Sequence, residues 1–324
     1  MDEKQISSRS HAYALFSSLL LHGIAQDTLP IVQQLDDLAA ALPQPIDLVK
    51  AAAMHQHVLG MNIFANESFF LDAAGLVGGQ VVDGVLASYR RVGYVSPAST
   101  SADHLGVELS LLSYLCGAQA DALADGYHTV AQEMKVAQRQ FLQRHLLCWI
   151  APCLTAIGRA DNAFYTEVAS LLLALVADHW AQVHASVPAK TSAEILLTAA
   201  PNLLDNDKTS LRDIAEFLVT PVYAGIYLSR DAITGLGRQQ QLPRGFGERR
   251  LLLTNLLQSA AQYDLAGAVF QELGGIVHAW GAAYAAMMAE YPLLTPFVLP
   301  WQQRAHQTRD QLNQMAELIP LNNE

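Results

Sequence analysis

Hydrophobic residues recur along most of the chain at the spacing of an α-helix, and no sustained alternation of apolar and polar residues indicates a strand. A wide apolar stripe runs from Ser8 to Ile24, and the segment from Asn162 to Val183 is apolar on most of its faces. The pattern therefore predicts an all-α protein. Further helices are expected over residues 47–59, 81–92, 102–115 and 127–147. A short helix is expected to begin at Ser229, and after a loop over 239–247 more helices should follow to about Ile319.

A change in pattern divides the chain in two. The segment His184–Ser192 contains a proline and leads into a capping-box sequence at Thr191–Glu194. We therefore expect one helical domain over residues 1–186 and a second helical domain over 187–324. A further capping-box sequence, Ser210–Asp213, predicts a helix start inside the second domain.

A third capping-box sequence lies earlier in the chain. Thr100 precedes Asp103 by three positions, just ahead of an apolar run. We therefore expect a helix to begin near Ala102, with Asp103 and His104 exposed in its first turn. The positive end of the helix dipole would hold the carboxylate ionised there, and His104 could donate or accept a hydrogen bond at neutral pH.

The segment Asn62–Asp72 reads as irregular backbone rich in aromatic residues, and more aromatics follow it. Aromatic side chains beside a charged pair are typical of a groove that binds a peptide. The same rings would also serve to close a helical core, and periodicity alone leaves both interpretations open. The aromatics in question are Phe64, Phe69, Phe70, Tyr89 and Tyr94.

Composition narrows the classes of partner. With 324 residues, of which 52% are apolar and 15% charged, the chain has the composition of an ordered globular protein. The net charge of −11 argues against nucleic acid, because phosphate binding needs clustered lysine and arginine. An acidic surface attracts basic peptides, although such a charge also serves solubility alone.

Cysteine spacing and hydropathy favour a cytoplasmic protein without a membrane span. The three cysteines match no zinc or redox motif, so we expect small core residues in a reducing compartment: Cys116, Cys148 and Cys153. The polar N-terminus lacks the basic start and apolar stretch of an export signal. Between Glu272 and Glu290 no residue is formally charged, but this stretch is at the short limit for spanning, and a buried helix is expected.

Motifs for catalysis are weak. No nucleophile motif, dinucleotide loop or phosphate loop is present. His104 and Glu108 lie on one face of the predicted helix, and His55 and His57 add two imidazoles, which leaves a helical metal-dependent enzyme as one alternative. A scaffold protein that dimerises through the region after Thr191 is another.

Three stretches resemble one protein family, in the same order along the chain. The run Ser101–Leu109 resembles the Pro-Asp-His-Ile-Gly-type motif of the TorD/DmsD/NarJ group, and Asn66–Asp72 resembles its Pro-Tyr-Glu-Ser-Val-Tyr-Leu segment. The run Phe141–Trp149 resembles its Phe…His-Leu…Trp stretch. These proteins are cytoplasmic chaperones that mature molybdenum-containing oxidoreductases, and the resemblance covers roughly Ser8 to Trp180.

The resemblance implies a chaperone that binds the N-terminal twin-arginine signal of an apo-molybdoenzyme and assists cofactor insertion before export. It implies no catalysis and no cofactor of the chain's own. Asp103 and His104 fall on the family's signal-binding pair, and Asp103 with Glu67 would face the two arginines. The peptide-binding residues that we expect are Asp103, His104, Glu67, Ser68, Phe64, Phe69, Phe70, Leu71, Glu108 and Tyr94.

The chain departs from this family at three positions and in length. Ala65, Asn66 and Ala102 stand where members have proline or an aromatic residue, which changes the rigidity of the loops and the apolar part of the groove. The region after Thr191 extends beyond a minimal member. Three roles for it stay open: a cover for the groove, a contact with the enzyme body, and the surface of a homodimer.

Overall fold

The computed structural model describes residues 3–185, 195, 197–205, 208–243 and 245–318. Across these residues the regular elements are helices, and the β-type pairing found there is one isolated bridge, between Asn66 and His104. The all-α prediction is confirmed. The chain divides into two compact units, residues 1–69 with 76–193 and residues 70–75 with 194–324. The boundary expected over His184–Ser192, and the capping box at its end, lie almost wholly outside the described residues.

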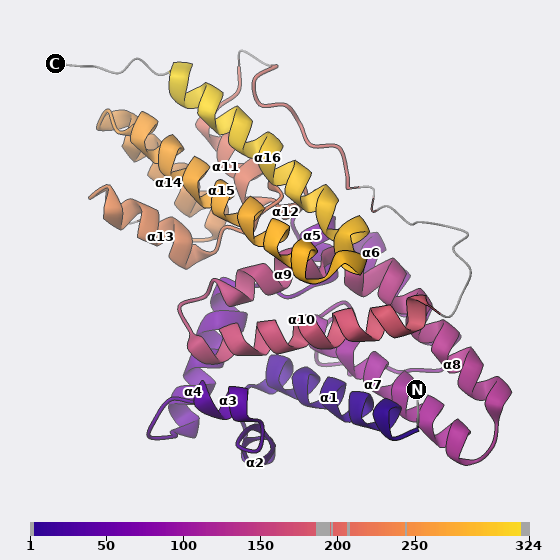
Figure 1. Ribbon diagram of the computed structural model, residues 1–324. Helices are drawn as coiled ribbons and strands as arrows, with labels where there is room; N and C mark the ends of the chain where they lie inside the picture. Colours follow the sequence, from indigo (N-terminus) through magenta and orange to yellow (C-terminus); the bar gives the residue numbers. More distant parts are fainter. Residues whose placement is uncertain (1–2, 186–194, 196, 206–207, 244, 319–324) are drawn as a thin grey trace. The chain divides into compact units, whose positions relative to one another are not determined.

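The first unit contains three long helices and several short ones (Figure 1). Its elements are α1 (Glu3–His22), α2 (Leu29–Val32), α3 (Asp36–Ala40), α4 (Leu48–His55), the π-helix η1 (Gln56–Asn62), α5 (Glu67–Leu71), which ends in the second unit, α6 (Gly79–Arg91), α7 (Leu105–Ala124), α8 (His128–Phe141), the π-helical turn η2 (Leu142–Leu146), α9 (Leu147–Gly158) and α10 (Ala163–His184).

The core of this unit forms around α1 and α7, which pack along most of their lengths (Figure 1). A buried polar chain ties further helices to them. The hydroxyl of Tyr13 on α1 lies 2.9 Å from Nδ1 of His179 on α10, and Nε2 of His179 lies 3.0 Å from Oε1 of Gln138 on α8. Nε2 of Gln138 donates to the carbonyl oxygen of Leu115 on α7 at 3.1 Å. Burial lowers the pKa of His179 well below its usual value, so it joins this chain as neutral imidazole.

Several predicted helices begin or end elsewhere. The helix expected over residues 102–115 runs from Leu105 to Ala124, because His104, rather than a residue before it, caps the helix. The helix expected over residues 127–147 passes through the π-helical turn η2 and continues as α9. The segment Asn62–Asp72, expected to be irregular, contains the short helix α5.

The second unit is built from two long C-terminal helices and shorter ones before them. Its elements after residue 194 are α11 (Leu211–Val219), α12 (Pro221–Ala224), α13 (Arg230–Gln239), α14 (Arg249–Gln262), α15 (Ala266–Glu290), the 3₁₀ turn η3 (Pro292–Leu294) and α16 (Thr295–Leu318). Helices α15 and α16 pack along each other, and α11 packs on α14 (Figure 1). The capping box of Ser210 and Asp213 is confirmed at the start of α11.

A buried arginine fixes the irregular backbone of this unit. Nη1 of Arg249 donates to the carbonyl oxygen of Leu228 at 2.8 Å, and Nη2 donates to that of Val219 at 3.0 Å. The guanidinium also lies 4.4 Å from the ring centroid of Tyr227, in cation–π geometry. Arg249 therefore ties both ends of the aromatic stretch before α13 to the start of α14.

Two expectations about apolar segments can be compared with the structure. The uncharged stretch between Glu272 and Glu290 lies within α15, whose inner face packs on α16. Within the described residues, no helix combines the length and the hydropathy needed to cross a bilayer.

The three cysteines differ in burial: Cys116 and Cys153 are buried and Cys148 is half-buried. Burial raises the pKa of the Cys116 and Cys148 thiols to about 12.

Candidate functional site

Two segments that the sequence singled out run side by side at the start of α7. Ala65–Glu67 and Asp103–Leu105 form the isolated antiparallel bridge of the first unit, and we call the pair the motif bridge. Two backbone hydrogen bonds of 2.9 and 2.8 Å join them: Glu67 N–H to Asp103 O, and Leu105 N–H to Ala65 O. The motif bridge therefore holds the start of α5 against the start of α7.

Asp103 is the centre of the motif bridge and is fully buried. Its carboxylate accepts hydrogen bonds from the amide and the hydroxyl of Ser68 at 2.9 and 2.5 Å, from Nδ2 of Asn66 at 3.1 Å and from the hydroxyl of Ser101 at 2.5 Å. The predicted exposure of Asp103 and the capping box with Thr100 are both wrong. The helix begins two residues after Asp103, which leaves the carboxylate turned inward toward Ser68.

His104 caps α7. Its Nδ1 accepts a hydrogen bond from the amide of Gly106 at 3.1 Å, which requires that this nitrogen carry no proton. Burial lowers the pKa of the imidazole to about 4, and the nearby Asp103 offsets only part of this effect. His104 is therefore neutral at pH 7, with its proton on Nε2, and this nitrogen has no hydrogen-bond partner among the described residues.

Glu67 points away from the motif bridge into the core. Its two carboxylate oxygens lie 3.2 and 3.1 Å from Nδ1 of His145 on η2. Nε2 of His145 lies 2.8 Å from the hydroxyl oxygen of Ser88 on α6. The sequence had assigned no role to His145, although it lies in the Phe141–Trp149 stretch that carried the family resemblance. The expectation that Glu67 faces a partner's arginine is not met, because its side chain is buried.

Glu108 is a second buried acid next to Glu67. It is fully buried on α7, beside Glu67 and the indole of Trp149. Burial raises its pKa well above the ordinary value, and the neighbouring Glu67 and Asp103 raise it further by charge repulsion. Burial therefore favours the protonated form of Glu108, which lies in the core, away from any surface that a peptide could reach.

The residues considered for a metal-dependent enzyme do not form one cluster. Within the part of the chain that the structure describes, no group of three or more His, Cys, Asp or Glu side chains is placed to hold a metal ion. Nε2 of His55 instead lies 3.1 Å from the carbonyl oxygen of Leu20, and Nε2 of His57 lies 3.3 Å from Nδ2 of Asn62.

The predicted aromatic groove is only partly formed. Phe64 is 37% exposed and its ring centroid lies 5.2 Å from that of Phe69, which is almost completely buried. Phe70 is fully buried in the second unit, where it stacks on Tyr227 at 5.4 Å. Tyr94 is half-buried and touches Tyr89 edge-on at 5.1 Å. Leu71 is half-buried as well.

The part of the chain that holds this geometry matches a known protein family. Residues 58–155 match the model of a family described as the nitrate reductase delta subunit. Over these residues the chain is similar to the nitrate reductase delta subunit family. The family includes the NarJ- and TorD-type chaperones that mature molybdoenzymes, so the resemblance noted in the sequence is confirmed over these residues. No curated protein matches the chain.

Residues 58–155, which we call the delta-subunit segment, contain the whole motif bridge, His145 and Glu108. They also contain a glycine whose role the structure explains, Gly106. Gly106 follows the Asp-His-Leu run and faces Ser17 and Leu21 of α1. A Cβ atom at this position would lie 2.6 Å from Cγ of Leu21 and 3.1 Å from the carbonyl oxygen of Ser17. The hydroxyl of Ser17 donates to the carbonyl oxygen of Gly106 at 2.7 Å. Glycine therefore permits the close contact of α1 and α7, a role the sequence alone does not reveal.

Proposed function

We propose that the chain is a maturation chaperone without catalytic turnover, which binds the N-terminal signal segment of an apo-molybdoenzyme in the cytoplasm before cofactor insertion. The match of residues 58–155 to the delta-subunit family supports this proposal, because the family consists of chaperones of this kind. The same residues contain the motif bridge. The partner that we propose is the catalytic subunit of a molybdopterin oxidoreductase, bound through its twin-arginine leader.

We place the peptide contact at Phe64 and His104. His104 is part of the motif bridge, and Phe64 directly precedes it in the chain. Both residues retain solvent-accessible surface. Phe64 offers an apolar face for the hydrophobic part of a leader. His104 offers Nε2–H as a donor for a backbone carbonyl of the bound peptide.

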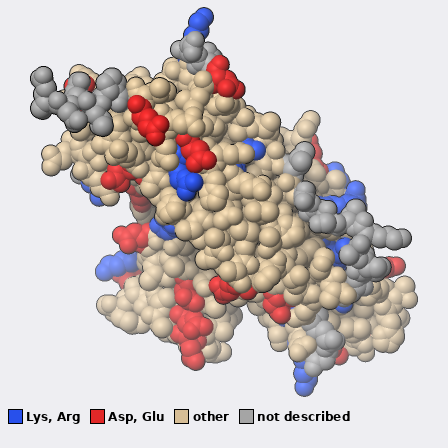
Figure 2. Space-filling view, turned by 45° about the horizontal axis from the view of Figure 1, so that its top comes forward, with Lys and Arg blue, Asp and Glu red and all other residues tan. Residues whose placement is uncertain are grey.

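The buried acids have a different role in this proposal. Asp103 and Glu67 keep the motif bridge in shape, so they act on the peptide only through Phe64 and His104. The leader's arginines are attracted by the overall net charge of −11. Figure 2 shows one face of the molecule, on which acidic and basic side chains lie in small separate groups between wide neutral areas. Because His104 is neutral at pH 7, it does not repel an arginine nearby.

Synthetic leader peptides test this site. Peptides with the twin-arginine leaders of the host's molybdoenzymes are titrated by calorimetry at pH 7 against the full chain and two variants. Phe64→Ala removes the apolar face, and His104→Asn retains a side chain that caps helices well while it removes the imidazole donor. We expect at least one leader to bind, and each substitution to weaken that binding about tenfold, as for anchors at the centre of an interface.

The matched control is Phe246→Ala, which removes an 85% exposed phenylalanine outside the delta-subunit segment. Its affinity is expected to equal that of the unmodified chain. If a leader binds and both Phe64→Ala and His104→Asn bind it as tightly as the unmodified chain, with unchanged helical content, the peptide lies elsewhere. If no leader from the host binds, the proposed partner is wrong.

A further inference from the structure

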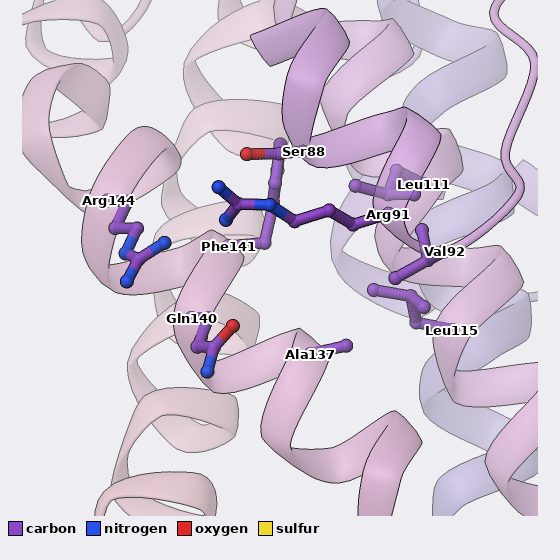
Figure 3. A pocket seen from close by; sticks show the side chains of 9 residues that line it. All are labelled: Ser88, Arg91, Val92, Leu111, Leu115, Ala137, Gln140, Phe141 and Arg144. Atoms are coloured by element: carbon purple, nitrogen blue, oxygen red, sulfur yellow. The ribbon is translucent and has the colours of Figure 1, made fainter. Parts of the chain in front are cut away.

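A pocket on the first unit lies between α6, α7, α8 and η2, and none of its residues is among those expected to bind a peptide. Its floor is apolar, and two arginines and two neutral polar side chains stand at its rim (Figure 3). The floor and wall consist of Val92, Leu111, Leu115, Ala137 and Phe141, and the rim of Ser88, Arg91, Gln140 and Arg144. The rim thus comes from three different elements.

Two arginines line this pocket, and none of its lining residues is acidic. Figure 3 shows the guanidinium groups of Arg91, on α6, and Arg144, on η2, at the rim of the pocket. Neither forms an ion pair or a hydrogen bond with any residue that the structure describes. Their mutual repulsion costs free energy, which a bound anion would offset.

One neutral group at the rim can add a hydrogen bond to the same anion, because Gln140 carries an amide N–H₂ group. The hydroxyl of Ser88 is already used: Nδ1 of His145 faces the carboxylate of Glu67 and carries the proton, so Nε2 accepts from this hydroxyl at 2.8 Å. Ser88 therefore connects this pocket to Glu67 behind His145.

We propose that this pocket binds a phosphate group. Two guanidinium forks together with an amide donor suit an oxyanion with at least three oxygens and up to two negative charges, whereas one fork is enough for a carboxylate. The pocket is small, with a volume of about 30 Å³, and it is open to solvent, so the oxyanion lies at its rim and any substituent extends outward. Arg91 and Arg144, whose side chains are exposed, bind the charge there.

Calorimetric titration with inorganic phosphate at pH 7 and constant ionic strength tests this proposal. We expect saturable binding of one phosphate per chain. Arg91→Gln and Arg144→Gln should each weaken it about tenfold, as expected for loss of a charge-assisted hydrogen bond, and the double variant should abolish it. The control Arg90→Gln makes the same change of charge at the neighbouring residue, which does not line the pocket, and should leave affinity within about twofold, because exposed distant charges are screened.

Three further probes complete the experiment. Sulfate should compete with phosphate, and acetate at equal ionic strength should not. Pyrophosphate distinguishes the source: binding as tight as that of phosphate supports a phosphate carried by a larger molecule, and weaker binding supports free phosphate.

Equal losses of phosphate affinity in Arg90→Gln and Arg91→Gln would show that only the general positive charge matters, and would overturn the site. Acetate binding as tight as phosphate, or no saturable phosphate binding, would overturn it as well.

Discussion

The two units each contain a buried charged residue that shapes irregular backbone, and the two residues do so in opposite ways. In the first unit, Asp103 accepts hydrogen bonds from one backbone amide and three side chains. In the second, Arg249 donates to two backbone carbonyls and lies over an aromatic ring. Asp103 thus satisfies buried donors and Arg249 satisfies buried acceptors. A donor left without a partner is rarer in proteins than an under-satisfied carbonyl, so the two sites should differ in how much they tolerate truncation.

The comparison also shows that a charged residue in a loop does not by itself indicate an exposed binding group. Asp103 sits in a short polar run before an apolar helix, and this pattern suggested an exposed binding group. Arg249 sits beside Arg250 at the start of α14, and nothing in the sequence separates the buried one from the exposed one. In both cases the role depends on groups far away in the chain, such as Ser68 for Asp103 and Val219 for Arg249.

The largest effect is expected from Asp103→Ala. The substitution strands the amide and hydroxyl of Ser68 and the amide of Asn66 in a buried place, and each lost partner costs about 1–3 kcal/mol. We expect the free energy of unfolding to fall by about 3–5 kcal/mol. Urea unfolding followed by circular dichroism measures the loss, and hydrogen exchange should show faster exchange at the amides of Glu67 and Leu105.

The control for this prediction is Asp47→Ala. Asp47 is also an acid that accepts backbone amides, those of Val49 and Lys50 at the start of α4, but its site is open to water. Water can replace the carboxylate there, so the loss should be about 1 kcal/mol. If Asp103→Ala costs no more than Asp47→Ala, the motif bridge does not depend on the buried carboxylate.

Arg249→Met should cost less than Asp103→Ala. Methionine fills much of the same volume but leaves the carbonyl oxygens of Val219 and Leu228 without their donor. We expect a loss of about 2–4 kcal/mol in the free energy of unfolding, with faster hydrogen exchange confined to the second unit.

The matched control is Arg250→Met, next in sequence and half-exposed, with ion pairs of 3.6 Å to Glu216 and 3.2 Å to Glu248. Exposed ion pairs of this kind contribute below about 1 kcal/mol. Similar losses for the two variants would show that Arg249 acts through its charge in general and that its two carbonyl contacts add nothing.

These comparisons indicate what the sequence can predict here. Helical periodicity predicted the fold class, and the Ser210–Asp213 sequence predicted a real helix start, because both depend on neighbours within a few residues. The Thr100–Asp103 sequence has the same pattern, yet its acid bonds to Ser68, 35 residues away. The sequence selected the two segments of the motif bridge but could not show that they touch. The burial of Glu108 and Phe70 likewise depends on packing between distant segments.

The smallest expected effect is a difference in the pH dependence of stability between variants of two neighbouring acids in the first unit, Glu108 and Glu67. Glu108 has a pKa well above its ordinary value in the folded chain, because burial and the charge of Glu67 both oppose its ionisation. A carboxyl whose pKa is raised by folding contributes stability that is fully present below its unfolded pKa, about 4.3, and is lost as the pH rises. For one proton the loss is up to about 1.4 kcal/mol for each pH unit between the unfolded and the folded pKa.

Glu108→Gln removes this titration and keeps nearly the same shape. We therefore expect its free energy of unfolding, relative to that of the unmodified chain, to rise as the pH increases above the unfolded pKa, by up to about 1.4 kcal/mol per pH unit, as urea unfolding at about pH 5 and about pH 6 would show. Glu67→Gln should behave in the opposite way and destabilise at both pH values, because an amide is a poorer acceptor than the carboxylate that faces His145. If Glu108→Gln follows the pH dependence of the unmodified chain, Glu108 does not hold the buried proton, and the distinction between the two acids fails.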